Sequence, residues 1–287
     1  MKKITQLVLV TLTLLVTQSC MVLDSIKGSG KIATKTLNYS DFNSIYVSNS
    51  FKVNIIQSTT DKVIIRYDDN LEDFLNLSQE SDKISFGLKY GYNYQNINIS
   101  VEIHTSNLSK ITASRSSEIL LDKFETENLT FHISGASEVK GNLIIADELS
   151  IISSGASEIN FIGETRNANF DISGASELSL ENFNFFNNLT VESSGASDLY
   201  LVGECQNANL DFSGASELEA QDLIVSNNLI IESSGASSIS ITANNNITLD
   251  LSGASDCHLY GNGKIISNVN SGASSIKKHT RHKKELK

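Results

Sequence analysis

Eight copies of the tetrapeptide Ser-Gly-Ala-Ser lie between residues 134 and 274, and no other feature of the sequence constrains the fold as strongly. Successive copies are 18 to 21 residues apart. A repeat of this length is typical of a solenoid, in which each unit stacks on its neighbours and all units share one core. Glycine adopts backbone angles that other residues resist, so we expect each copy to form a structural turn. The eight turn glycines are Gly135, Gly155, Gly174, Gly195, Gly214, Gly235, Gly253 and Gly272.

Apolar residues alternate with polar ones on both sides of each turn. In the copy at Gly174, the fourth and sixth positions before the glycine are Phe170 and Ala168, and those after it are Leu178 and Leu180. A period of two is typical of a strand with one buried face, so each rung is expected to have two strands flanking the turn. Equivalent strands then stack about 4.8 Å apart. The sequence therefore predicts an all-β, parallel β-solenoid over residues 111–276, with rungs of about twenty residues.

A second period of forty residues indicates that rungs are paired. The position two before the glycine alternates between large and small side chains, as in Ile133, Ser153, Ile172 and Ser193. Apolar pairs also recur forty residues apart and predict a short third strand on alternate rungs. An asparagine column, seven positions before the glycine, predicts a ladder of side-chain amides. Its members are Asn128, Asn167, Asn188, Asn207, Asn228 and Asn246.

The N-terminus has the pattern of an export signal. Lys2 and Lys3 precede an apolar stretch over residues 4–16, which is too short to span a membrane, and Cys20 follows a small residue. We expect residues 1–19 to be a signal peptide, Cys20 to be lipidated, and residues 20–27 to form a linker. The chain would then be an outer-membrane lipoprotein of a Gram-negative bacterium, held by its lipid anchor at the cell surface or the periplasmic face. An ordinary secreted protein cut nearby is the alternative.

The net charge limits the classes of partner, and the positions of the cysteines argue against a disulfide. The net charge of −11 argues against a nucleic-acid partner and against an anionic membrane surface, because both attract Lys and Arg. Cys205 and Cys257 fall at different points of their rungs, so a disulfide is not expected. Both are interpreted as core or wall residues.

Two columns of acidic residues flank the turns, three positions after and three before each glycine. Strand parity directs both columns outward, where water and salt reduce their mutual repulsion. Solvated charge that discourages aggregation is one interpretation. Capture of Ca²⁺ in an envelope structural protein is the other, and Ca²⁺ is the only cofactor considered. The columns contain Glu138, Glu158, Glu177, Asp198 and Glu217 after the glycine, and Asp171, Glu192, Asp211 and Glu232 before it.

Catalysis is not expected, although β-helices include polysaccharide hydrolases and lyases that use clustered carboxylates. The acids recur in every rung, whereas a catalytic pair usually interrupts a repeat. The five histidines are scattered and share no register with the serines. No catalytic residue is therefore assigned, and a polysaccharide-active enzyme remains the alternative function.

Residues 85–99 carry three closely spaced tyrosines, Tyr90, Tyr92 and Tyr94. They are candidates for a hairpin tip that presents its rings to sugars or to a partner, since tyrosine binds with little loss of conformational entropy. Ordinary packing within a strand is the alternative.

The opening of the chain adds a family resemblance. Gly28-Ser29-Gly30-Lys31-Ile32, Phe42-Asn43-Ser44-Ile45-Tyr46-Val47 and Asp68-Asp69-Asn70-Leu71, together with the Ser-Gly-Ala-Ser rungs, resemble the head GIN domain family of putative auto-transporter adhesins over residues 28–276.

The resemblance implies a right-handed parallel β-helix, export, and a non-catalytic adhesive role toward a host or envelope glycan or protein. It also makes a homotrimer a candidate assembly. Residues 28–110 are expected to form an N-terminal β segment and cap. In place of a translocator barrel, residues 277–287 are a basic tail, expected to stop the last rung from pairing with another chain.

Overall fold

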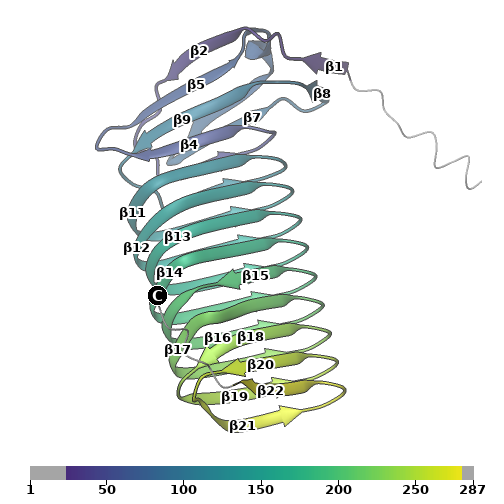
Figure 1. Ribbon diagram of the computed structural model, residues 1–287. Helices are drawn as coiled ribbons and strands as arrows, with labels where there is room; N and C mark the ends of the chain where they lie inside the picture. The colour runs from purple at the N-terminus through teal and green to yellow at the C-terminus, as the bar shows by residue number, and fades with distance from the viewer. Residues whose placement is uncertain (1–23, 280–287) are drawn as a thin grey trace, which may run out of the picture.

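The computed structural model describes residues 24–279, which form a parallel β-solenoid of about eight turns closed at one end by a cap (Figure 1). The prediction of an all-β solenoid with rungs of about twenty residues is confirmed. The signal peptide, Cys20 and residues 280–287 of the basic tail lie outside the described residues. Within residues 24–279, no helix has the length and apolar character needed to cross a membrane.

The N-terminal segment combines antiparallel and parallel pairing. Strands β2, β5 and β9 pair antiparallel, as do β6 and β7. Strands β3 and β4 pair in parallel with the first strands of the repeat, which joins the segment to the solenoid. Its elements are β1 (Asp24–Lys27), β2 (Ile32–Leu37), β3 (Ser44–Val47), β4 (Lys52–Gln57), β5 (Lys62–Asp68), the 3-10 helix η1 (Asp69–Phe74), β6 (Leu75–Glu80), β7 (Lys83–Leu88), β8 (Tyr92–Gln95) and β9 (Ile99–Thr105).

The parallel stack begins earlier than residue 111. Strands β3 and β4 form a rung whose turn places Asn49, at φ +63°, where later rungs have glycine. In the next rung Arg115 takes the same place at φ +66°. The left-handed turn is thus present in these first two rungs, although neither has glycine at this position.

The solenoid proper lies below this segment in Figure 1, and its last rung ends at His279. The final strand thus extends three residues into the expected tail, and its Lys277 pairs in register with His258. The strands are β10 (Lys110–Ala113), β11 (Glu118–Ile133), β12 (Glu138–Ser153), β13 (Glu158–Ile172), β14 (Glu177–Ser193), β15 (Asp198–Leu201), β16 (Gly203–Phe212), β17 (Glu217–Ser233), β18 (Ser238–Ala243), β19 (Asn246–Leu251), β20 (Asp256–Tyr260), β21 (Lys264–Asn270) and β22 (Ser275–His279).

The expectation of two strands per rung holds for the rungs formed by β15 and β16, by β18 and β19, and by β20 and β21, but not for the others, and no separate third strand occurs among the described rungs. Strands β11 to β14 and β17 each run for 15 to 17 residues without a break. The chain bends instead at register shifts, such as the one between Thr165 and Asn167. A β-bulge bends a strand while the ladder on either side continues, so the alternating pattern did not reveal where the bends lie.

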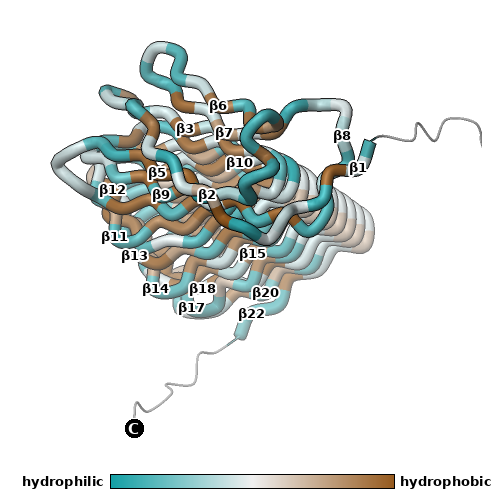
Figure 2. Tube along the Cα trace, turned by 90° about the horizontal axis from the view of Figure 1, so that it is seen from above, coloured by the Kyte–Doolittle hydropathy of each residue, from teal (hydrophilic) through white to brown (hydrophobic). Residues whose placement is uncertain are grey.

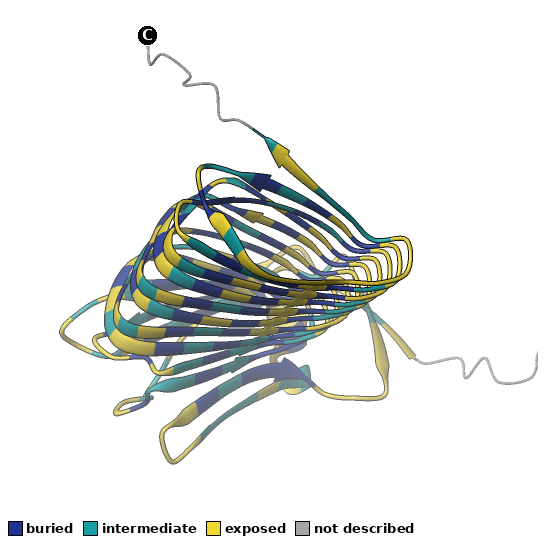
Figure 3. Cartoon of the chain, turned by 90° about the horizontal axis from the view of Figure 1, so that it is seen from below, coloured by how far each residue is buried: buried dark blue, intermediate teal, exposed yellow. Residues whose placement is uncertain are grey.

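Like side chains stack along the interior. Ile151, Phe170 and Val191, in register at the fourth position before the glycine, are all 0% exposed. Apolar and polar residues alternate along each rung in Figure 2, and buried and exposed residues do so in Figure 3. The core therefore runs the length of the stack.

The forty-residue period has a steric cause. Leu143, Gly163, Phe183, Gly203 and Leu223 occupy one column of the rungs. A Cβ added at Gly163 would lie 1.8 Å from the carbonyl oxygen of Leu143, and one at Gly203 would lie 1.9 Å from that of Phe183. Glycine is therefore required at these two positions. Large residues alternate with glycine from Leu143 to Leu223, where two rungs form one packing unit, whereas Phe124 lies directly beside Leu143 at the upper end of the column.

The Ser-Gly-Ala-Ser segments form one sharp corner of the solenoid. All eight of their glycines have φ between +71° and +88°. The second serine of each copy closes the turn, as where Ser197 Oγ donates to the carbonyl oxygen of Ser194 at 3.0 Å. These serines are engaged in the backbone turn, which is a structural role.

The predicted asparagine ladder is confirmed where the column is uninterrupted. Side-chain amides join successive members at 3.0 to 3.1 Å from Asn167 to Asn246. Glu148 replaces asparagine one rung earlier, and the ladder begins after it.

Candidate functional site

The two acidic columns lie on the outside of the solenoid, as strand parity predicts. Glu158, Glu177, Asp198 and Glu217 follow one another in register and are exposed. At the upper end, Lys140 forms ion pairs with Glu138 and Glu158, the latter at 3.6 Å. Across residues 24–279, no three His, Cys, Asp or Glu side chains converge in a way that could hold a metal ion.

The tyrosine segment does not form a hairpin tip. Residues 92–95 form β8, which pairs in parallel with β1. Tyr94 is half-buried and donates its hydroxyl to the carbonyl oxygen of Lys89 at 2.8 Å. Tyr92 is 37% exposed and Tyr90 is 69% exposed. The segment is thus packed at one end and open to solvent at the other.

The two cysteines are core residues, as the sequence indicates. Cys205 and Cys257 are free and buried. Burial raises the pKa of each thiol to about 12, so both remain protonated near neutral pH and are poor nucleophiles or metal ligands.

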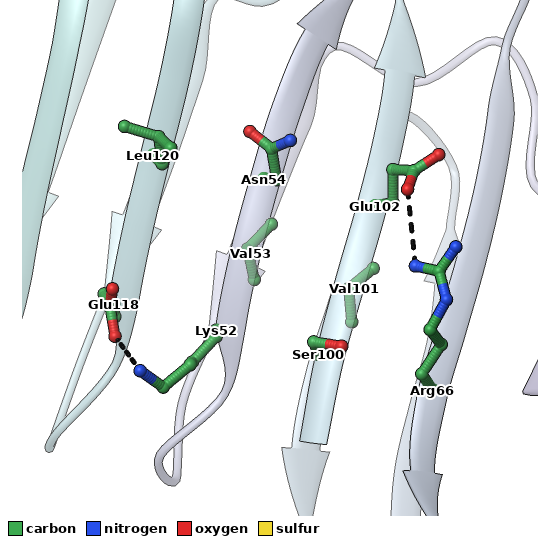
Figure 4. A pocket seen from close by; sticks show the side chains of 9 residues that line it. All are labelled: Lys52, Val53, Asn54, Arg66, Ser100, Val101, Glu102, Glu118 and Leu120. Atoms are coloured by element: carbon green, nitrogen blue, oxygen red, sulfur yellow. Dashed lines mark hydrogen bonds and ion pairs between the residues drawn. The ribbon is translucent and has the colours of Figure 1, made fainter. Parts of the chain in front are cut away.

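A groove crosses the outer face of four strands where the cap meets the first rungs (Figure 4). It has a volume of about 250 Å³. A second hollow of about 320 Å³ shares Lys52, Arg66 and Ser100 with it, so the two form one continuous surface, which we call the cap groove. The side chains of the first hollow come from β4 (Lys52, Val53, Asn54), β5 (Arg66), β9 (Ser100, Val101, Glu102) and β11 (Glu118, Leu120).

Two ion pairs cross the cap groove. Lys52 Nζ lies 2.6 Å from Glu118 Oε2, and Arg66 lies 3.3 Å from Glu102 Oε2. Figure 4 shows the two pairs on different strands, with Asn54 between them. Both cations stay more than 40% exposed, so they retain N–H groups for a ligand.

The ionisation of the cap groove is fixed by these contacts. Hydrogen bonding to His104, at 2.9 Å, lowers the pKa of the Glu102 carboxyl, and Arg66 lowers it further. The hydrogen bond and the charge of Glu118 raise the pKa of Lys52. The Glu102 carboxyl is thus held in the ionised form.

The groove also contains an enclosed polar atom and exposed apolar groups. Asn54 Oδ1 has less than 1 Å² of accessible surface and no hydrogen-bond partner within the described part of the chain. Leu120 is 51% exposed at one edge of the groove, and Ile32 is 54% exposed at the other. Donors, acceptors and apolar edges in an open groove suit a polar polymer better than a small enclosed cofactor.

The sequence did not reveal the cap groove. Its charged pairs join residues 36 and 66 positions apart, and Lys52, Arg66 and Glu102 lie on strands outside the predicted repeat. One signal was available: Lys52 stands three residues after Asn49, where later rungs carry an acid. Recognising residues 44–57 as a rung would have shown a cation beside the acidic column.

The fold defines a capped parallel β-solenoid, and the cap groove makes it a candidate binding protein. The chain belongs to the family described as "Putative auto-transporter adhesin, head GIN domain", whose model matches residues 41–187 and 182–263. The family inferred from the sequence is confirmed.

Solved structures share this fold. A putative adhesin from Parabacteroides merdae is 19% identical with a TM-score of 0.66, over 89% of this chain and 99% of its own. A putative lipid binding protein from Parabacteroides distasonis is 18% identical with a TM-score of 0.68, over 89% and 100%. A putative adhesin from the same species is 17% identical with a TM-score of 0.66, over the same shares. No curated protein matches the chain.

Proposed function

We propose that this chain is a lipid-anchored, non-catalytic adhesin of the outer membrane, which binds a glycan or a glycan-bearing protein in the cap groove. Membership of the adhesin family supports the adhesive role. The N-terminal signal pattern with Cys20 supports export and anchoring.

The observation that carries the proposal is the chemistry of the cap groove. Lys52 and Arg66 place N–H donors beside the carboxylates of Glu118 and Glu102, and Asn54 lies between them. Hydroxyl groups donate to carboxylates and accept from cations, so a carbohydrate chain can satisfy both kinds of group at once. The near-balance of charge favours a neutral chain over a polyanion.

The same groove gives little support to hydrolysis. Glu102 and Glu118 lie on β9 and β11, two positions out of register and with β4 between them, so the strands that carry them are roughly 10 Å apart; this exceeds the spacing of a retaining pair and is at the upper limit for an inverting pair. A general acid also needs a raised pKa, whereas the pKa of Glu102 is lowered. Both carboxylates are committed to ion pairs in the groove.

A glycan array probed with the mature chain, with a reducing-sugar assay on every bound glycan, tests the proposal. We expect binding without release of reducing ends, and loss of at least about tenfold in affinity in Lys52→Ala combined with Arg66→Ala. The control is Lys264→Ala, which removes an exposed cation far from the groove. Release of reducing ends would establish the polysaccharide-active enzyme instead.

Protease shaving of intact cells tests the location. Digestion of the chain on intact cells places it at the cell surface and permits host adhesion. Survival on intact cells, followed by digestion after the outer membrane is opened, restricts the ligand to the cell's own envelope.

A further inference from the structure

A partly exposed aromatic patch lies beside the cap, where the end of η1 meets the segment between β7 and β9. The edge of Tyr92 meets the Phe74 ring with centroids 5.0 Å apart, and Tyr94 lies 6.2 Å from both rings. Tyr90 lies two residues before Tyr92 and is 69% exposed. We define the aromatic patch as Phe74, Tyr90, Tyr92 and Tyr94.

Cationic side chains border the patch. The guanidinium of Arg115 lies 4.7 Å from the centroid of the Tyr90 ring. Lys89, beside Tyr90 in the sequence, and Lys27, at the end of β1, are exposed. Exposed acids, Asp24 on β1 and Glu72 and Asp73 beside Phe74, match these cations in number, so the surroundings are close to neutral although the whole chain carries −11. Exposed tyrosine rings with flanking Lys and Arg are the combination enriched where proteins meet the membrane–water interface.

The patch is adjacent to the first described strand. Strand β1 begins at Asp24 and pairs in parallel with β8, which carries Tyr92 and Tyr94 (Figures 1 and 2). Only residues 21–23 separate Asp24 from Cys20 in the sequence. Four residue steps span at most about 14 Å, so an acylated Cys20 would hold the patch within reach of the headgroup layer.

We propose that the aromatic patch is a membrane-contact surface, which lies against the bilayer that anchors the chain. This inference depends on the lipid anchor of the proposed function. The tyrosine rings lie among the headgroups, and Lys27, Lys89 and Arg115 reach lipid phosphates. A short tether makes this contact intramolecular, so that even a weak patch is occupied.

This contact sets the orientation of the molecule. The cap groove and the aromatic patch both belong to the N-terminal end of the solenoid, so the rungs point away from the bilayer. The groove then lies at the membrane-proximal end. That position favours a ligand of the cell's own envelope over a receptor on another cell.

The chain contains no tryptophan, which allows a direct optical test. The acylated mature chain carrying Tyr90→Trp as its sole tryptophan is reconstituted in phosphatidylcholine vesicles, with or without lipid brominated along its acyl chains. We expect a blue-shifted emission and loss of about half of its intensity with brominated lipid. Y92W serves as a second reporter, and circular dichroism checks the fold of each variant.

Tyr200→Trp is the matched control, because Tyr200 is also exposed, at 40%, but lies on β15 in the middle of the solenoid. Its emission should stay red-shifted and unquenched. Co-flotation with vesicles, but equal and unquenched emission from Y90W and Y200W, would overturn the membrane contact and leave the anchor standing. Failure to float would contradict the anchor and, with it, this proposal, while glycan binding by the groove would be unaffected.

Discussion

Single residues decide whether the corner of each rung can close. Gly195 has φ +85°, and a Cβ added there would lie 2.5 Å from the carbonyl oxygen of Gly174. Arg115 and Asn49 adopt the same left-handed region near the cap, so backbone angle alone does not require glycine. The close approach of the preceding rung, at Gly174, adds the requirement.

Gly195→Ala is therefore expected to lower the free energy of unfolding by roughly 3 kcal/mol, from the left-handed strain plus the forced displacement of a backbone neighbour. Gly30→Ala is the matched control: Gly30 has φ +76° but no heavy atom within 4 Å of the added Cβ. It should cost only about 1 kcal/mol. Urea unfolding measures both, and equal losses would contradict the packing argument.

The ionisation of Glu102 makes the stability of the fold depend on pH. Its pKa is lowered in the folded chain by His104 and Arg66, so the ionised carboxylate is the stabilised form. That contribution is complete above its ordinary value of 4.5 and is lost as pH falls through the lower folded value. Because Arg66 is 43% exposed, the contribution is at most about 1 kcal/mol.

Glu102→Gln should accordingly reduce stability at about pH 7 and make progressively less difference toward about pH 3. Urea midpoints across this range measure the change, with Glu219→Gln, an exposed acid of β17, as the control. A deficit of equal size at both ends of the pH range would show that the ion pair is not its cause.

At the scale of elements, the repeat made the solenoid predictable and left the cap hidden. Columns such as Ile151, Phe170 and Val191 recur at fixed offsets from the turn, so their stacking follows from period alone. The bends escaped prediction because a register shift changes no residue type. The cap escaped because β5 returns antiparallel between non-repeating segments, so the partner of Arg66 could not be read from spacing.

The pairing of rungs predicts how the stack tolerates deletion. Removing residues 175–214, forty residues, places Gly163 beside Leu223 and keeps the alternation of large and small residues. Removing residues 175–195, a single rung, places Gly163 beside Gly203 and Ile172 beside Phe212. The contacts formed by the forty-residue deletion are native-like. The single-rung deletion instead leaves a void where Gly163 meets Gly203 and crowds Ile172 against Phe212.

We expect the forty-residue deletion to unfold cooperatively and the single-rung deletion to be less stable by about 2 kcal/mol or more, although it removes fewer contacts. Urea unfolding of the two shortened chains measures this difference. If the single-rung deletion proved the more stable chain, packing units of two rungs would be disproved.

For the whole molecule, the repeat forms a scaffold and the proposed binding surface lies at the capped end. The regular rungs carry exposed acids in columns, while the cap groove brings Lys52, Arg66 and Asn54 beside Glu102 and Glu118. These parts are separable, because residues 175–214 contribute no side chain to the groove. Scaffold and binding surface can therefore be altered independently.

The most direct measurement compares glycan binding by three chains: wild type, the deletion of residues 175–214, and Lys52→Ala combined with Arg66→Ala. We expect the shortened chain to bind the same glycans as wild type, and the groove variant to fold but lose at least about tenfold in affinity. Loss of binding in the shortened chain, with full binding by the groove variant, would instead place the binding surface on the rungs.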